Sequence, residues 1–250
     1  MRIYTLLLSV LLFSCKDALD TVATDPYTEI KKALSINPLA LENYAAQGKP
    51  AYVNKDNTGA NAITDKAASL GRVLFYDKNL STNNTIACAS CHKQEFAFGD
   101  TAISSLGVEN GRTERHSMRL INTRYANEAK FFWNERAASL EAQTTMPIVD
   151  HLEMGFSGQT GRGTITSLIT KLNGIGYYKE LFKLAYGDAT ITEARMQTAL
   201  AQFVRSIQSF DSKYDVGRAQ SPNDAAPFPN FTAQENAGKA LFINPPLFNA

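Results

Sequence analysis

The stretch Cys88-Ala89-Ser90-Cys91-His92 constrains this chain more than any other feature of its sequence. Two cysteines three positions apart, with a histidine directly after the second, form the attachment pattern of a c-type haem. The pattern fits the chemistry because two thiols can bond to the two vinyl groups of one porphyrin, while the adjacent imidazole ligates the iron. We therefore predict one covalently bound haem c, held by Cys88 and Cys91, with His92 as an axial iron ligand.

Other interpretations of the cysteine pair explain less of the sequence. A zinc site would need two more ligands, and His116 and His151 lie thirty-five positions apart, far from the compact spacing of zinc fingers. A thioredoxin-like redox pair expects a βαβ context, whereas the surrounding sequence is typical of helix and loop. A plain disulfide is compatible with an exported protein. The redox pair also leaves His92 without a role.

The first fifteen residues have the pattern of an export signal. A short charged start, Met1 to Thr5, precedes the apolar run Leu6 to Ser14, which is too short to span a bilayer. Leu12 to Cys15 resembles the lipobox of bacterial lipoproteins, in which the cysteine becomes the lipidated first residue of the mature protein. The alternative is a signal peptide with a chance cysteine near its cleavage point. We expect a periplasmic or cell-envelope protein whose membrane attachment is a lipid anchor on Cys15.

The composition argues against one class of partner. The 250 residues are 44% hydrophobic and 20% charged, with 25 basic and 24 acidic side chains and a formal net charge of +1. Nucleic acids are held mainly by neutralising their phosphates, so a chain without a basic excess or a long run of one charge is not expected to bind them. The length suffices for one large domain or two modest ones.

Hydrophobic periodicity predicts an all-α protein. Residues 93–115, rich in Gly, Asn and charge, form the exception and have the character of a long loop wrapped on a cofactor. The clearest helix opens with the capping box Thr190 to Glu193 and carries along one face the core residues Met196, Leu200, Phe203, Ile207 and Phe210. Further helices are expected at 64–76, 27–34, 165–172, 177–185 and 137–145, the last of them ended by Pro147.

A second capping box and a weak internal repeat indicate that another domain begins near residue 230. Pro222 to Pro229 has the composition of an interdomain linker, and the capping box Thr232 to Glu235 follows it. The order of residue types in Gly238 to Asn244 then matches that in Gly71 to Asp77, the segment ahead of the haem motif. If the repeat holds, we expect a second haem motif beyond residue 250 and a sequence that is a fragment.

Several stretches together resemble the bacterial di-haem cytochrome c peroxidases and their relatives, the MauG-type enzymes. The similarity runs from about Ala67 to the end of the chain and implies a cytochrome c-like fold. The similarity rests on three features: the residues that lead into and form the haem motif, a second signature downstream, and a segment that resembles the helix before the family's second haem motif. These stretches are Leu70 to Phe75, Leu80 to His92, Phe132 to Ala137, Leu140 to Gln143, Pro147, Leu152 to Gly155, and Gly238 to Phe242.

Beyond haem attachment, the resemblance assigns roles to three residues. Glu153 would be the distal acid/base, which takes a proton from peroxide and returns it to the leaving oxygen so that water leaves instead of hydroxide. Gln143 would be a neutral donor that orients peroxide without competing for the proton. Trp133 would sit between the two haems as an electron relay.

The chain also departs from the family's pattern. In the stretch Arg115 to Asn122, His116 stands where the family has an asparagine and Met118 where it has a proline. That asparagine helps to bind an interdomain calcium ion in the family, which leaves calcium binding open here. His116 and His151 are candidate sixth ligands of the iron, although an ordinary surface position is the more common explanation for either. The family's ligand histidine in the intervening loop has no evident match, so we expect an iron that is open to peroxide without prior reduction.

Together these patterns predict an all-α, cytochrome c-like protein in four parts. They are a lipoprotein signal peptide (1–15), a tether and N-terminal extension (16–61), an N-terminal haem domain (62–220), and a linker with the first helix of a truncated second haem domain (221–250). The resemblance implies reduction of hydrogen peroxide with electrons that enter through the second haem from a small protein such as a cytochrome c or a cupredoxin. The alternatives are MauG-type oxidation of a protein or organic substrate, and a non-catalytic c-type electron carrier.

Overall fold

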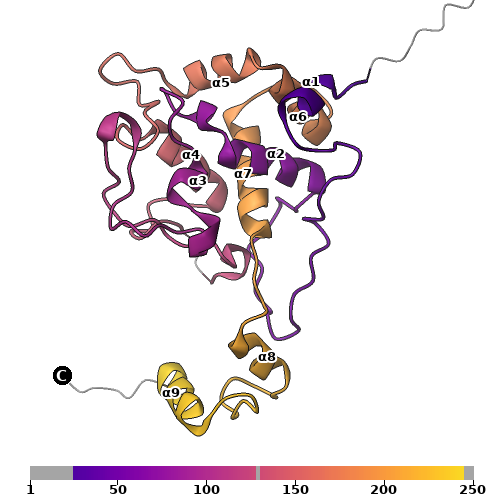
Figure 1. Cartoon of the computed structure of the whole chain (residues 1–250), viewed down its shortest axis with the longest axis vertical. Coiled ribbons are helices and arrows are strands. Elements are labelled where there is room, and N and C mark those ends of the chain that lie inside the picture. Colours follow the sequence, from indigo (N-terminus) through magenta and orange to yellow (C-terminus); the bar gives the residue numbers. More distant parts are fainter. Residues whose placement is uncertain (1–24, 128–129, 245–250) are drawn as a thin grey trace, which may run out of the picture.

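The computed structural model describes residues 25–127 and 130–244 (Figure 1). Within these two ranges the chain is helical, and its extended backbone makes only isolated bridges, such as that between Lys93 and Gly99. The all-α prediction is confirmed. The expected signal segment and Cys15 lie outside the described residues. In the same two ranges, no helix is both long and apolar enough to cross a membrane.

Nine α-helices make up the ordered framework of the described ranges, joined by long irregular segments. Short 3₁₀ turns at Lys78–Leu80, Gln94–Phe96, Val108–Asn110 and Thr123–Tyr125 interrupt these segments. In chain order the helices are α1 (Thr28–Ala33), α2 (Asp65–Tyr76), α3 (Cys88–Cys91), α4 (Leu140–Val149), α5 (Ile165–Asn173), α6 (Gly176–Tyr186), α7 (Glu193–Ser206), α8 (Lys213–Ala219) and α9 (Ala233–Ile243).

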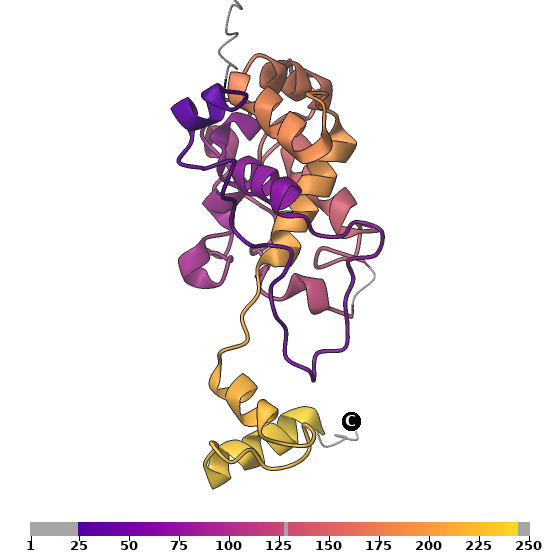
Figure 2. The same ribbon diagram turned by 90° about the vertical axis from the view of Figure 1, so that its right-hand side faces the viewer.

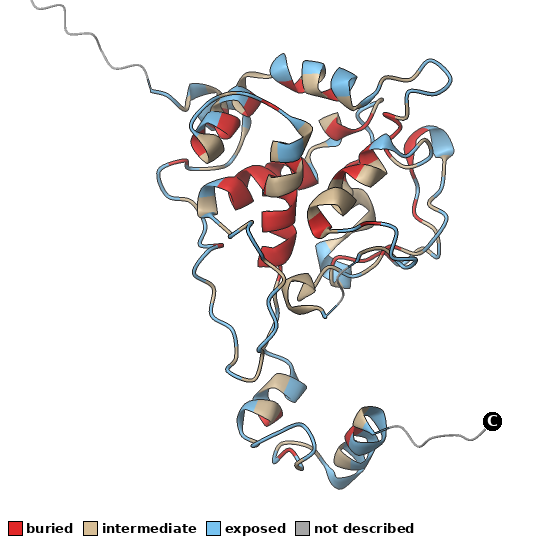
Figure 3. Ribbon diagram, turned by 180° about the vertical axis from the view of Figure 1, so that it is seen from behind, coloured by how far each residue is buried: buried red, intermediate tan, exposed pale blue. Residues whose placement is uncertain are grey.

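Helices α2 and α7 cross at the centre of the larger part of the molecule and carry much of its core (Figures 1 and 3). The crossing is close because Gly71 of α2 faces the backbone of α7. A Cβ atom at Gly71 would lie 2.0 Å from the carbonyl oxygen of Ala199, so no larger residue fits without moving a helix. Leu70, Leu74 and Leu200 beside this contact are at most 1% exposed, which makes the crossing a dry, tightly packed core.

The helix predicted at 137–145 is displaced in the structure. It starts at Leu140 because the hydroxyl of Ser139 accepts a backbone hydrogen bond from the first turn and caps the helix there. It also continues through Pro147, which the sequence predicts as its end, to Val149. A proline this close to the C-terminal end removes a single helical hydrogen bond, so the last turn persists.

The other predicted helices of the larger part form with small changes at their ends. The ranges of α1, α2, α5 and α6 agree with the predictions to within one residue. Helix α7 begins after Thr192 and not at the predicted capping box that opens with Thr190. The acidic member of that box, Glu193, instead accepts a hydrogen bond from the Thr145 hydroxyl of α4 at 2.9 Å. Helix α7 ends at Ser206, so two residues predicted on its face, at 207 and 210, follow it.

A narrow connection, residues 207–212, leads from α7 to α8 and α9, which lie below the larger part in Figures 1 and 2. The stretch Pro222 to Pro229, which the sequence suggests as the linker, is packed against these two helices instead. Its Phe228 is 1% exposed, and the Lys239 ammonium of α9 lies 4.2 Å from the Phe228 ring centre. The connection therefore comes before α8 because an apolar side chain fixes the proline-rich stretch in place.

The two copies of the internal repeat form helices in different surroundings. Helix α9 is capped as the sequence predicts, by Thr232 with Glu235. No atom lies within 4 Å of the position that a Cβ of Gly238 would take, and Leu241 and Phe242 are 61% and 87% exposed. The matching residues of α2 are buried against α7. Within the described residues, only the first copy is packed against a partner helix.

This difference predicts opposite outcomes for the same substitution in the two copies. Gly71→Ala is expected to destabilise the protein by about 1–3 kcal/mol, because the new methyl group must push α2 away from α7. Gly238→Ala meets no atom and should be neutral or stabilise α9 by up to ~1 kcal/mol through helix propensity. Urea unfolding followed by far-ultraviolet circular dichroism measures both. Equal effects of the two substitutions would contradict the close contact at Gly71.

Candidate functional site

A cavity opens between the core helices and two loops, and the predicted haem motif lines it. Helices α2, α3, α4 and α7 supply one set of walls, and the loops at 113–120 and 132–136 supply another. Residues next to α3 and α4, among them Ile86, His92, Asp150 and Glu153, complete the lining. Its apolar wall includes Phe75, Ile86, Leu140, Met154, Leu200 and Val204. Its charged side chains are Glu114, Arg115, Arg136, Asp150 and Glu153. An apolar wall with basic groups beside it suits a flat porphyrin that carries two propionates.

Both cysteines of the motif face this cavity as free thiols. Cys88 and Cys91 are the first and last residues of the single-turn helix α3, and both line the cavity without forming a disulfide. Burial, together with the neighbouring Cys91, raises the pKa of the Cys88 thiol to about 12, and burial also raises the pKa of Cys91. The thiols are therefore uncharged at neutral pH, and both are free for thioether bonds.

The imidazole of His92 is prepared to ligate a metal. Its Nδ1 lies 2.9 Å from the carbonyl oxygen of Phe98. A carbonyl can only accept, so Nδ1 carries the proton and Nε2 is left with a free lone pair. Burial lowers the pKa of His92, which favours the neutral form that binds metals. The thiols, the imidazole and the cavity together fit a c-type haem.

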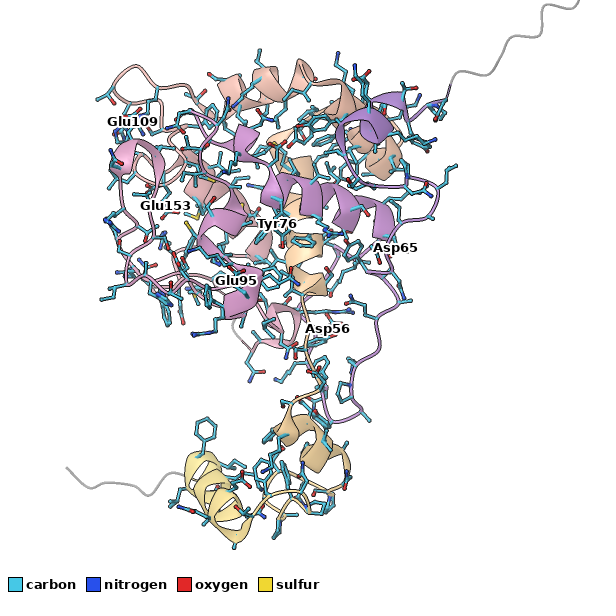
Figure 4. The ribbon with its side chains drawn as sticks, in the orientation of Figure 1. Asp56, Asp65, Tyr76, Glu95, Glu109 and Glu153 are labelled. Carbon is cyan, nitrogen blue, oxygen red and sulfur yellow. The ribbon has the colours of Figure 1, made fainter. Side chains whose placement is uncertain are left out.

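Glu153 contributes a carboxyl group to the same cavity, and Figure 4 labels it beside α3. Burial, with a smaller contribution from the Asp150 carboxylate, raises the pKa of Glu153 to about 7, against the opposing effect of Arg136. The group therefore exists in both protonation states near neutral pH. Glu153, to which the resemblance assigns the acid/base role, thus lines the same cavity as Cys88, Cys91 and His92.

The other two residues of the second signature also reach the cavity. Gln143 lines it from α4. Trp133 lies at its rim, where 60% of the residue is exposed, and its Nε1 donates to the carbonyl oxygen of His116 at 2.8 Å. The side chain of Trp133 therefore borders both the cavity and the solvent, whereas Gln143 lines the cavity from α4.

The structure separates the two candidate sixth ligands. His116 lines the cavity, and its Nδ1 lies 2.9 Å from the carbonyl oxygen of Ala102. His151 does not line the cavity: its Nδ1 lies 2.8 Å from the hydroxyl of Ser157. His116 thus stays a candidate, whereas His151 is held away from the haem motif. In the described ranges, no group of three or more His, Cys, Asp or Glu side chains is arranged to hold a metal ion.

Comparison with known proteins decides the family. The family model described as di-haem cytochrome c peroxidase matches residues 65–221. The chain belongs to this family. A methylamine utilization protein MauG from Methylophilus methylotrophus is 32% identical over 170 residues, which are 67% of this chain and 48% of that protein. A cytochrome c551 peroxidase from Nitrosomonas europaea is 29% identical over 192 residues, which are 74% of this chain and 54% of that protein.

Solved structures agree with this assignment. A MauG-like protein associated with microbial copper homeostasis superposes with a TM-score of 0.59 at 30% identity, over 67% of this chain and 48% of that chain. A variant of the dihaem peroxidase BthA from Burkholderia thailandensis superposes with a TM-score of 0.59 at 24% identity, over 82% of this chain and 54% of that chain, which shows likeness of fold alone. The cytochrome c-like prediction is confirmed. The chain spans about half the length of the curated relatives it matches.

Asp100 holds together the loop that follows the haem motif, although no sequence pattern points to it. Its side chain is 4% exposed and accepts from the Lys93 ammonium at 2.8 Å and from the Ser105 hydroxyl at 2.6 Å. Ser105 in turn lies 2.9 Å from the hydroxyl of Ser117. The loop between Lys93 and Asp100 contains Phe98, whose left-handed backbone presents its carbonyl to the imidazole of His92. The only signal in the sequence is an aspartate followed by small polar residues, which is typical of a turn.

Asp100 is expected to stabilise the loop in a pH-dependent way. Burial alone would raise the pKa of Asp100, but hydrogen bonds from Lys93, Ser105 and two backbone amides hold it well below its usual range. A lowered pKa means that the contribution to stability is present above the unfolded-state pKa of about 4 and is lost as the pH falls through the folded-state value. Asp100→Asn should therefore cost about 1–3 kcal/mol at neutral pH and less in acid.

The free energy of unfolding of the wild type and of Asp100→Asn is measured by urea unfolding at neutral pH and at successively lower pH. Asp188→Asn is a matched control, because the ion pair of Asp188 with Arg195 lies on the surface, where the aspartate side chain is 54% exposed and solvent screens the interaction. A difference between wild type and Asp100→Asn that stays constant with pH would contradict the charged role of Asp100.

Proposed function

We propose that this chain is the peroxide-reacting part of a haem peroxidase that reduces hydrogen peroxide to water. One observation carries the proposal: a Glu153 carboxyl with a pKa of about 7 lies in the wall of the cavity that Cys88, Cys91 and His92 line. A group with this pKa can both accept and donate a proton at neutral pH, which peroxide reduction requires.

One haem c would be held by thioether bonds to Cys88 and Cys91 and by Nε2 of His92. When bound, the haem supplies the redox chemistry that breaks the oxygen–oxygen bond. The overall reaction consumes one peroxide, two electrons and two protons and produces two waters. The side chains of the cavity have to orient the peroxide and handle the protons.

Glu153 is the proposed proton carrier. As a carboxylate it accepts a proton from one oxygen of the peroxide, and as a carboxylic acid it donates that proton to the other oxygen. Water then leaves instead of hydroxide. Because the same carboxyl group takes and returns the proton, its pKa has to lie near the working pH, and burial beside Asp150 produces this shift.

Gln143 and Trp133 serve orientation and electron supply in this proposal. The amide of Gln143 can donate a hydrogen bond to peroxide without competing for its proton. The indole of Trp133, fixed at the rim through its Nε1, lies where electrons would enter from outside the cavity. We expect those electrons from a second haem beyond residue 250, reduced by a small cytochrome c or cupredoxin in the periplasm, with Cys15 as the lipid anchor.

A second candidate function is oxidation of a protein or organic substrate, which the 32% identity to a MauG protein favours. Mixing the full-length protein with peroxide and a reduced cytochrome distinguishes the two candidate functions. Rapid oxidation of the cytochrome supports the peroxidase. A long-lived change in haem absorption without consumption of the cytochrome supports the MauG-type reaction. An iron that neither peroxide nor carbon monoxide reaches indicates an electron carrier.

Glu153→Gln tests the proton carrier directly. The amide has nearly the same shape but cannot take up the proton, so peroxide consumption by the full-length protein is expected to fall by about 10²–10⁴-fold. In the wild type, the rate of the reaction with peroxide should rise as the pH increases through about 7, because the carboxylate is the form that accepts the proton. The variant should lack this rise. Stopped-flow absorbance gives both measurements.

Glu95→Gln provides the matched control, because Glu95 is exposed and does not line the cavity (Figure 4). It should keep both the rate and its pH dependence. Haem content, measured by absorbance, has to be equal in all three proteins. Peroxide turnover that survives in Glu153→Gln would exclude Glu153 as the proton carrier.

A further inference from the structure

Two tyrosines of α6 share one carboxylate oxygen next to the core. The hydroxyls of Tyr177 and Tyr178 each donate to Oδ2 of Asp77 at 2.7 Å. The other oxygen of Asp77 accepts from the backbone amide of Asn79 at 2.8 Å, so the carboxylate acts only as an acceptor. The two rings lie 4.7 Å apart between centroids. Tyr178 is fully buried and Tyr177 is half-buried.

This cluster is close to the haem-attachment motif. Asp77 directly follows α2, two residues after Phe75, which lines the haem cavity with its ring centre 6.4 Å from that of His92. Tyr178 belongs to the same hydrophobic core as Phe75, and Cys88 packs against that core. Burial, together with the charge and the hydrogen bond of Asp77, raises the pKa of the Tyr178 phenol. The tyrosine pair therefore borders the core that Phe75 and Cys88 also contact, with Tyr177 as its more exposed member.

A buried tyrosine can be oxidised only if its proton has somewhere to go. A neutral phenol holds its proton firmly, with an ordinary pKa of about 10, whereas a phenol that has lost an electron is a strong acid. A buried hydroxyl passes its proton most directly to a base that is already hydrogen-bonded to it. An ionised carboxylate is such a base, and a backbone carbonyl is not. Asp77 meets this requirement for both tyrosines with one oxygen atom.

We propose that Tyr178, Tyr177 and Asp77 form a redox-active site that gives one electron to the haem after peroxide has oxidised it. The inference rests on the proposed peroxidase function, which supplies the oxidant. Tyr178 loses an electron to the oxidised haem, which is reduced by one electron, and passes its hydroxyl proton to Oδ2 of Asp77. The products are a neutral tyrosyl radical and a protonated aspartate.

A second step carries the oxidising equivalent outward. An electron moves from Tyr177 to the Tyr178 radical, while Asp77 returns its proton to Tyr178 and takes the hydroxyl proton of Tyr177. Both hydroxyls bond to the same oxygen, so no side chain has to move between the two steps. The radical then resides on the half-buried ring, where a small reductant in solvent can quench it. The site thus removes an oxidising equivalent from the core when the electron donor is absent.

A third tyrosine of the same helix gives a matched control. Tyr186 is half-buried, and its hydroxyl donates to the backbone carbonyl of Arg195 at 2.8 Å. That carbonyl cannot take up a proton. If the tyrosines of α6 serve packing and hydrogen bonding alone, replacing any of them with Phe leaves the response to peroxide unchanged. If Tyr177 and Tyr178 have the redox role, replacing either of them with Phe changes the response to peroxide, whereas replacing Tyr186 does not.

The experiment mixes the haem-loaded ferric protein with peroxide in the absence of an electron donor and freezes samples at successive times. Electron paramagnetic resonance detects radicals while haem absorption is recorded in parallel. Protein grown with ring-deuterated tyrosine shows whether the signal is tyrosyl or belongs to an indole such as Trp133. The wild type is expected to give a tyrosyl signal that is lost in Tyr178→Phe and retained in Tyr186→Phe.

Two further variants keep the test decisive if Tyr178→Phe does not fold. Asp77→Asn retains a hydrogen-bond acceptor but not the base, so it should lose the signal. Tyr177→Phe should retain the signal and slow its decay, because the radical can no longer move outward. Haem content and thermal unfolding establish that each variant is intact.

The possible results are distinct. A haem whose absorption changes on reaction with peroxide, with no tyrosyl signal or with a signal unchanged in Tyr178→Phe, Tyr177→Phe and Asp77→Asn, overturns the tyrosine site and leaves the peroxidase function standing. A haem whose absorption does not change with peroxide overturns both. A tyrosyl signal that depends on Tyr178 and Asp77 but not on Tyr186 establishes the site.

Discussion

The close crossing of α2 and α7 at Gly71 is the contact on which the haem site depends. Because Gly71 meets the backbone of Ala199, the two helices approach closely enough to share one wall of the cavity, with Phe75 from α2 and Leu200 and Val204 from α7. The C-terminal end of α2 also fixes the start of the segment that leads to α3. One glycine therefore positions both the apolar wall and the chain that delivers the two thiols.

The environments of three acidic residues around this core differ, and the difference explains what each can do. Asp100 accepts hydrogen bonds from an ammonium and a hydroxyl, which keep it ionised, so it holds a loop in place. Asp77 accepts two phenol hydroxyls on one oxygen. Glu153 is half-buried near another carboxylate, with only Arg136 favouring its charge, so its pKa rises to about 7. Of these three carboxyl groups, only that of Glu153 lines the cavity.

The sequence predicts features of this site that depend on local patterns. The spacing of Cys88, Cys91 and His92 predicts the attachment chemistry, and apolar periodicity predicts α1, α2, α5 and α6 to within one residue at each end. The family resemblance predicts Glu153 and Gln143, and both reach the cavity. The prediction that α4 ends at Pro147 is wrong, because α4 continues to Val149. How much a proline destabilises a helix depends on its position in that helix, which a sequence pattern does not show.

Features that depend on the tertiary structure escape prediction from the sequence. The role of Asp100 appears only when the loop folds back and brings Ser105 and Ser117 beside it. Asp77 and Tyr178 are 101 positions apart in the chain, and neither belongs to a recognisable motif. His116 and His151 are equivalent candidates in the sequence, whereas only His116 lines the cavity. Local chemistry can thus be predicted from local patterns, but hydrogen-bond partners distant in the chain cannot.

In the proposed reaction, the placement of these groups separates proton transfer from electron transfer. Glu153 and Gln143 lie in the wall of the cavity, where peroxide would bind, and Trp133 lies at its rim. Tyr178 is in the core outside the cavity lining, so it can supply an electron without occupying the space that peroxide needs. A tyrosine in the cavity wall would compete with Glu153 for hydrogen bonds to peroxide. Placing the phenol in the core beside its own carboxylate avoids that competition, because its proton moves to Asp77 and never enters the cavity.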